Sequence, residues 1–108
     1  LCNTLVCLAV WLCFAAHSVI DKVLAIIFPI AAFVALGFEH SIANMYFIPL
    51  AILAAADPAL LQAAGVAADG LDGAGMVRNL VPVTLGNIVG GGVFVALTYY
   101  VVYLRGHD

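Results

Sequence analysis

The chain has 108 residues, of which 67% are hydrophobic and only 8% are charged, and its formal net charge is -3. So few charges exclude an ordinary water-soluble domain, and three Lys and Arg residues are too few for a nucleic-acid-binding surface. Residues 4–16 and 23–37 are apolar on every side of a helix, so they need a lipid bilayer around them. The composition predicts an all-α membrane protein.

The first apolar run extends from residue 1 to residue 20, where Asp21 and Lys22 end it. About 20 apolar residues are enough to cross the hydrocarbon core, so this run predicts one transmembrane span. Its three cysteines have neither the spacing of a metal-binding pair nor that of a helical ligand face, so we expect free thiols and no metal site. The run lacks the basic start of a signal peptide, and we expect the chain to begin inside a longer protein.

The second apolar run covers residues 23–56 and is too long for one straight span. As a continuous helix it would be about 51 Å long, whereas the hydrocarbon core is about 30 Å thick. Gly37, Glu39 and His40 interrupt the run with a residue that tolerates unusual backbone angles and with two ionisable side chains. The sequence therefore predicts a second span that is broken near residues 37–41.

The remainder of the chain predicts a loop and a third span. Residues 57–78 contain three aspartates and several glycines, which indicates an aqueous loop, with or without a short amphipathic helix. Residues 80–104 are again apolar and predict the third span, in which a G-x-x-x-G spacing at residues 86–90, extended by Gly91 and Gly92, indicates close helix packing. Lys22 and Arg105 flank the same side of the membrane, so the positive-inside rule places that side and the C-terminus in the cytoplasm.

Glu39 and His40 are the strongest candidates for function. An ionised side chain at the bilayer centre costs about 2.5 to 3.5 kcal/mol or more, so it needs a partner or a water-lined cavity. In the alternative interpretation, His40 is a neutral, hydrogen-bonded packing residue and Glu39 is a charge at a helix end. The break favours function, because amides at the start of the next half-helix, near Ser41, attract anions and an adjacent imidazole titrates near neutral pH. These features suit a small, weakly acidic anion.

Asn3 and Asn44 are further polar residues inside the apolar runs, and Phe33 lies about two helical turns before His40. For both asparagines a pore role and an interhelical hydrogen bond stay open as alternatives, and for Phe33 the alternative is core packing. The sequence has no Gly-rich phosphate loop, Ser/His/Asp set or paired carboxylates. We therefore expect neither an enzyme nor a cofactor.

Three blocks of the sequence together form a specific pattern: LCNTLV at residues 1–6, FPIAAFVALGFEHSIANMYFIP at residues 28–49 and NLVPVTLGNIVGG at residues 79–91. They resemble the formate/nitrite transporter family, and the resemblance covers nearly the whole chain except the loop. It implies spans four to six of a six-span protein, so that residues 1–108 form the C-terminal half of one transporter domain. It also implies an aquaporin-like helical bundle with inverted repeats, a homopentamer with one pore per protomer, and a bacterial inner membrane.

The resemblance also assigns roles to single residues. His40 matches the central pore histidine, Asn3 the asparagine near it, and Phe33 an apolar residue that narrows the channel, while Val6 is expected along the same cavity. Polar residues that orient the histidine are matched by Glu39 and Asn44. The implied mechanism is that the anion takes a proton in association with His40 and passes Phe33 as the neutral acid, because protonation removes most of the burial cost.

Several alternatives for the transported species stay open. The FPI and IANMYFIP context is closer to formate-type members than to nitrite-type or hydrosulfide-type members, but all three anions are small and monovalent. A non-conducting membrane anchor or assembly protein with the same fold is a second class of function, in which the polar residues serve only packing. An aquaporin-type channel for neutral solutes is disfavoured, because the chain has no N-P-A motif.

Overall fold

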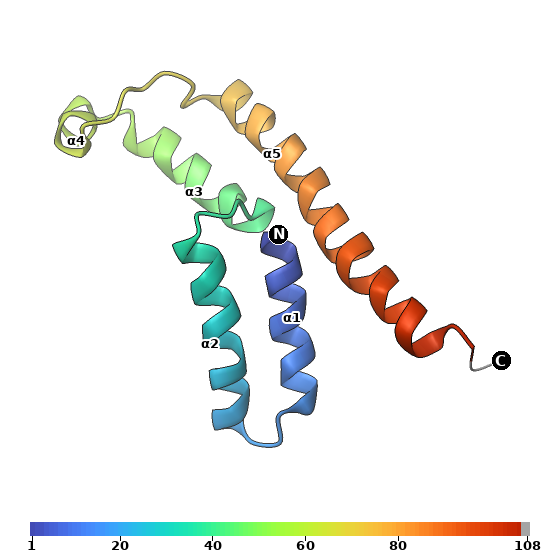
Figure 1. Cartoon of the computed structure of the whole chain (residues 1–108). Coiled ribbons are helices and arrows are strands. Elements are labelled where there is room, and N and C mark those ends of the chain that lie inside the picture. The colour runs from blue at the N-terminus through green and yellow to red at the C-terminus, as the bar shows by residue number, and fades with distance from the viewer. Residues whose placement is uncertain (107–108) are drawn as a thin grey trace. The chain divides into compact units, whose positions relative to one another are not determined.

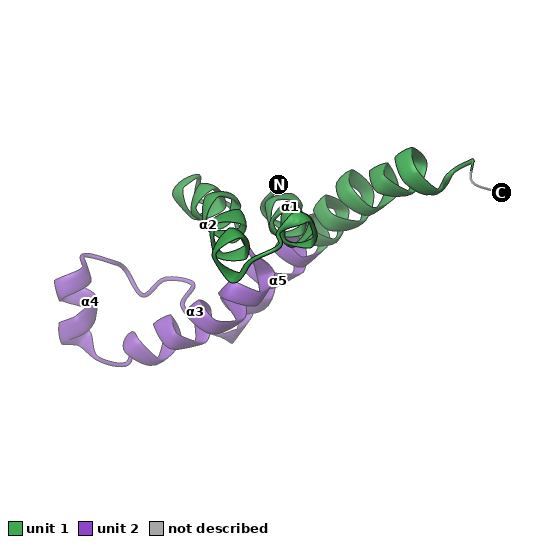
Figure 2. Cartoon of the chain, turned by 90° about the horizontal axis from the view of Figure 1, so that it is seen from below, with its two compact units in different colours: residues 1–39, 85–108 green, residues 40–84 purple. Residues whose placement is uncertain are grey.

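The computed structural model describes residues 1–106, and every regular element within this range is a helix. The elements in chain order are α1 (Cys2–Ala15), α2 (Val19–Ala35), α3 (Ser41–Ala54), α4 (Pro58–Ala64), α5 (Gly73–Ile88) and two π-helical segments, η1 (Val89–Leu97) and η2 (Tyr100–Leu104) (Figure 1). The chain divides into two compact units, one made of residues 1–39 and the chain from residue 85 onward, the other of residues 40–84 (Figure 2). The all-α class predicted from composition is confirmed.

Helices α1 and α2 form an antiparallel pair in the first unit (Figure 1). A capping box starts α2: the Ser18 hydroxyl accepts a hydrogen bond from the Asp21 amide at 3.1 Å, and the Asp21 carboxylate accepts one from the Ser18 amide at 3.1 Å. The helix bounds therefore differ from the predicted span at residues 1–20. Helix α1 ends at Ala15, and residues 19–22 form the first turn of α2 instead.

The end of α2 is a Schellman motif, which uses glycine in the left-handed conformation. Gly37 has a φ of 67°, and its amide donates to the Val34 carbonyl at 3.1 Å. The next amide, that of Phe38, donates back to the Phe33 carbonyl at 3.0 Å. The motif ends α2 at Ala35, and the interruption that the sequence predicts near residues 37–41 lies at residues 36–40.

In the second unit, α4 follows α3 after a bend of 117°. Asp57 caps α4 by accepting a hydrogen bond from the Ala59 amide at 2.9 Å, and Pro58 occupies the first helical position, where a missing amide costs nothing. Gly65, with a φ of 64°, ends the helix. The segment expected as an aqueous loop, residues 57–78, thus contains a short helix.

Helix α5 begins at Gly73, earlier than the expected start of the third span near residue 80. The Asp72 carboxylate accepts a hydrogen bond from the Gly75 amide at 2.6 Å, which satisfies one of the donors at this helix end. From Gly73 the helix continues into the π-helical segments to Leu104, and these 32 residues are long and apolar enough to cross a membrane. Helices α3 and α4 are long and apolar enough to cross a membrane only if they are counted together as one bent pair. Helix α1 is apolar but shorter. Three membrane crossings therefore stay a prediction.

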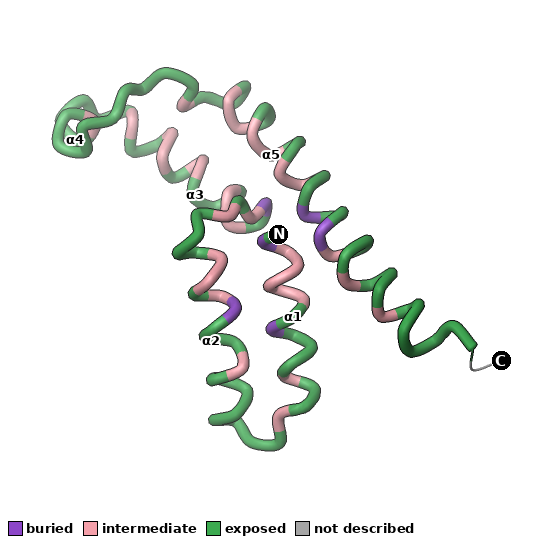
Figure 3. Tube along the Cα trace, in the orientation of Figure 1, coloured by how far each residue is buried: buried purple, intermediate pink, exposed green. Residues whose placement is uncertain are grey.

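The burial pattern differs from that of a water-soluble protein, because few residues along the chain are buried (Figure 3). Most of the large hydrophobic side chains are exposed, and the buried core of the described residues contains Cys2 and Ala9. Two polar residues, Ser41 and Asn87, are buried, at 7% and 9% exposure. In water this arrangement would be unfavourable, whereas in lipid the polar groups are the ones that need internal partners.

Candidate functional site

Asn87 connects two of the predicted site residues in the first unit. Its side chain lies in the apolar helix α5 and donates from Nδ2 to the backbone carbonyl of Glu39 at 3.0 Å. Its own backbone carbonyl accepts a hydrogen bond from Nδ2 of Asn3, on α1, at 2.9 Å. Asn3 and the backbone at the end of the interruption are thus both held by one residue of the last helix.

Helix α1 packs against η1 at two glycines. The Thr4 hydroxyl donates to the Gly90 carbonyl at 3.1 Å, and a Cβ added to Gly90 would lie 3.3 Å from the Thr4 Oγ1. A Cβ on Gly91 would lie only 2.6 Å from Nδ2 of Asn3. Gly86, the first glycine of the predicted G-x-x-x-G pair, has no atom within 4 Å of such a Cβ. Within the described residues, the close packing therefore falls on residues 90 and 91.

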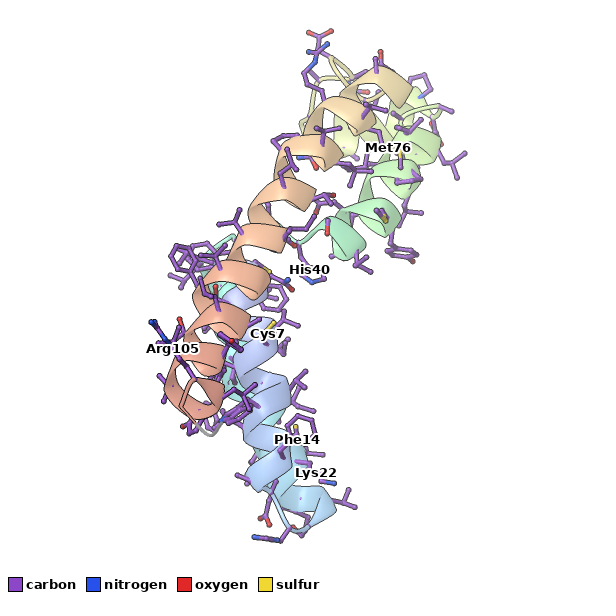
Figure 4. The ribbon with its side chains drawn as sticks, turned by 90° about the vertical axis from the view of Figure 1, so that its right-hand side faces the viewer. Cys7, Phe14, Lys22, His40, Met76 and Arg105 are labelled. Atoms are coloured by element: carbon purple, nitrogen blue, oxygen red, sulfur yellow. The ribbon has the colours of Figure 1, made fainter. Side chains whose placement is uncertain are left out.

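His40 is half-buried and caps the first turn of α3 (Figure 4). Its Nδ1 accepts a hydrogen bond from the Ala43 amide at 3.3 Å. A ring nitrogen that accepts a hydrogen bond carries no proton, so this geometry assigns the proton of the neutral imidazole to Nε2. The ring lies at the amide-bearing end of α3, where the helix dipole favours negative charge.

Asn44 lies in the first turn of α3 and bonds to a residue that the sequence did not single out. Its Nδ2 donates to Oδ1 of Asn79, on α5, at 2.8 Å within the second unit. This contact favours the packing interpretation of Asn44. The signal that could have identified Asn79 is the one that identified Asn3 and Asn44, namely an amide side chain beside an apolar run.

The predicted site residues divide between the two units. The first unit holds Asn3, Val6, Phe33 and Glu39. The second unit holds His40 and Asn44. Val6 follows Asn3 by about one turn of α1, Phe33 lies in the last turn of α2, and both side chains are half-buried. Within the first unit the structure brings together Asn3 and the Glu39 carbonyl, through Asn87.

The chemistry available at these positions is that of hydrogen bonding to a small anion or its neutral acid. The donors are side-chain amides, an imidazole and the first amides of a helix, in a segment with few charges. Residues 1–106 contain no group of three His, Cys, Asp or Glu side chains that could hold a metal ion. The glycine motif of the sequence includes Asn87 but does not indicate its hydrogen bonds to Asn3 and to the Glu39 carbonyl.

Comparison with known proteins gives concordant matches. The family described as formate/nitrite transporter matches residues 1–101. The chain is 46% identical to the formate channel FocA of Escherichia coli strain K12, covering 100% of this chain and 40% of that protein. It is 50% identical to a probable formate transporter of Methanothermobacter thermautotrophicus, covering 96% of this chain and 33% of that protein.

A solved structure, described as a pentameric formate channel with formate bound, is similar with a TM-score of 0.80 and 48% identity. The match covers 96% of this chain and 43% of that one. The chain thus spans between 33% and 43% of the length of these relatives. All of them are named as channels or transporters, in agreement with the prediction that this chain is not an enzyme.

Proposed function

Because the chain belongs to the formate/nitrite transporter family, we propose that it supplies the C-terminal repeat of a pore that carries small monovalent anions, formate first. The observation that carries the proposal is the position of His40. Its imidazole caps a helix that begins inside an apolar segment, so a titratable group and an anion-attracting helix end coincide. The relatives named above, which are formate channels and a probable formate transporter, support formate as the substrate.

The capping contact couples proton transfer to the backbone of α3. Nδ1 of His40 can either accept the hydrogen bond from the Ala43 amide or carry a second proton, and it cannot do both. An imidazolium that passes one proton to formate produces formic acid and a neutral ring, which can cap α3 again.

The neutral acid then passes the apolar part of the pore. We assign this narrowing to Phe33, with Val6 along the same cavity, because moving an uncharged acid across apolar surface costs far less than moving an anion. Asn3 lies one turn before Val6, and one of its two Nδ2 hydrogens is used by the Asn87 carbonyl. The second hydrogen can donate to the anion or the acid.

The remaining assignments concern orientation and assembly. Glu39 and Asn44 flank His40 and orient it. The protein lies in the bacterial inner membrane with Lys22, Arg105 and the C-terminus on the cytoplasmic side. It assembles as a homopentamer, as the related solved channel does by its description.

Formate flux through the full-length protein in lipid vesicles, measured between about pH 5 and about pH 8, tests the proposal. His40→Asn keeps a side-chain oxygen that can cap α3 but removes the titrating ring, and His40→Ala removes both. We expect the pH dependence to disappear in His40→Asn, with α3 still capped, and the flux to fall further in His40→Ala.

Each other outcome of this experiment contradicts a defined part of the proposal. An unchanged pH profile in His40→Asn would overturn the proton-transfer role. Flux of nitrite or hydrosulfide in preference to formate would move the substrate to another member of the same anion class. No flux of any of the three anions would favour the non-conducting anchor, in which the polar residues hold helices together.

A further inference from the structure

We propose that Asn87 and Gly91 are positioning residues for anion transport: Asn87 fixes the backbone that leads into His40, and Gly91 keeps space for the amide of Asn3. The inference rests on the proposed function, because its readout is the flux of the anion. It goes beyond that function by assigning transport roles to two residues of the last helix.

Asn87 acts on the interruption through a backbone atom. Its Nδ2 donates to the Glu39 carbonyl at 3.0 Å, and that carbonyl shares a rigid peptide plane with the nitrogen of His40. Fixing the carbonyl therefore fixes the orientation of the peptide from which the N-cap residue starts. The burial of Asn87, at 9% exposure, makes this hydrogen bond costly to lose, because water cannot readily replace the partner.

Gly91 acts on Asn3 through the absence of a side chain. A Cβ at this position would lie 2.6 Å from Nδ2 of Asn3, the atom that donates to the Asn87 carbonyl at 2.9 Å. Such a distance is too short for two non-bonded heavy atoms, so the Asn3 amide would have to turn away and release that hydrogen bond. The displaced atom is the end of a flexible side chain, and the next atom that the Cβ would meet, Sγ of Cys7 at 3.3 Å, needs to move only by a few tenths of an ångström.

A matched control lies next to Gly91. A Cβ on Gly92 would meet no atom within 4 Å, although Gly92 lies on the same π-helical segment and the substitution is the same. Gly91→Ala and Gly92→Ala therefore have the same effect on backbone entropy and on hydrophobicity. They differ in the contacts of the added Cβ, which at residue 91 displaces the Asn3 amide and lies close to Cys7.

The test combines two measurements on the full-length protein in lipid vesicles or nanodiscs. The first is formate flux as a function of formate concentration, for the wild type, Gly91→Ala and Gly92→Ala. We expect Gly91→Ala to raise the half-saturating concentration roughly 2- to 10-fold, the effect of one net hydrogen bond, with maximal flux changed less. Gly92→Ala should stay at the wild-type value.

The second measurement is amide hydrogen exchange over residues 36–40, for the wild type, Asn87→Leu and Asn87→Ala, two variants of different volume. We expect exchange to accelerate roughly 3- to 10-fold in both, because the hydrogen bond from Asn87 to the Glu39 carbonyl is lost. In flux, the same variants should shift the pH profile, which a loss of packing volume alone would not do.

Either of two results would overturn the inference while wild-type flux stays intact. The first is an equal half-saturating formate concentration in Gly91→Ala and Gly92→Ala. The second is wild-type amide exchange at residues 36–40 in both Asn87 variants. Absence of formate flux in the wild type would instead overturn the proposed function. In that case the exchange measurement still decides whether Asn87 holds the interruption, so the two failures are distinguishable.

Discussion

Replacing Gly37 with alanine isolates the backbone geometry at the end of α2. Gly37 has a φ of 67°, and a Cβ at this position would meet no atom within 4 Å, so the substitution introduces no clash with a neighbour. Its cost is the left-handed conformation itself, about 1 to 2 kcal/mol for an L-residue. Asparagine tolerates this conformation better, so Gly37→Asn should cost less than Gly37→Ala.

Gly86→Ala is the matched control, because a Cβ there is equally free of contacts but Gly86 lies within the α-helix. In a helix interior, alanine is favoured over glycine by about 1 kcal/mol. The two substitutions should therefore differ by about 2 to 3 kcal/mol in the free energy of unfolding. Titrating the full-length protein in micelles with a denaturing detergent measures this difference. Equal stability of Gly37→Ala and Gly86→Ala would refute the Schellman motif as the cause of the break.

Two further predictions concern single hydrogen bonds. Ser18→Ala should lower the free energy of unfolding by about 1 kcal/mol in the same titration, because the Asp21 amide loses its hydrogen-bond acceptor. Ser18→Asn should retain most of the stability, because asparagine also caps helices. An asparagine variant as unstable as the alanine variant would contradict the capping box. A double-mutant cycle with Asn44→Ala and Asn79→Ala should give a coupling energy of about 0.6 kcal/mol, and at most about 1.7 kcal/mol. A coupling near zero would mean that their 2.8 Å contact does not stabilise the fold.

The interruption between α2 and α3 was predictable because its signals are local. Gly37, Glu39 and His40 stand out chemically from an apolar run that is too long for one span, and both facts can be read from neighbouring residues. The start of α2 was also encoded locally, in the Ser18 and Asp21 pair. It was missed because the span was placed by the length of the apolar run, which does not report a capped turn of this kind.

The role of Asn87 was not predictable in the same way. Its partner Asn3 is 84 positions away, so the hydrogen bond depends on how α1 and the last helix are aligned lengthwise. The run of glycines indicated close packing but not which of its members make it, and the close approach falls on residues 90 and 91. The segment from Val89 is π-helical, and the 3.6-residue period used to align side chains on an α-helix does not hold there.

The exposure of the large apolar side chains also determines which positions tolerate substitution. In a water-soluble protein the strictest positions are the large apolar residues of the core, because each lost methylene leaves a cavity. In this chain many large apolar side chains are exposed, so exchanges among Leu, Ile, Val and Phe at those positions change little in the chain's own packing. A saturation scan should instead find its intolerant positions at small and polar residues such as Ser41, Asn87 and Gly91, where one added or lost atom disturbs a hydrogen bond or a close helix contact.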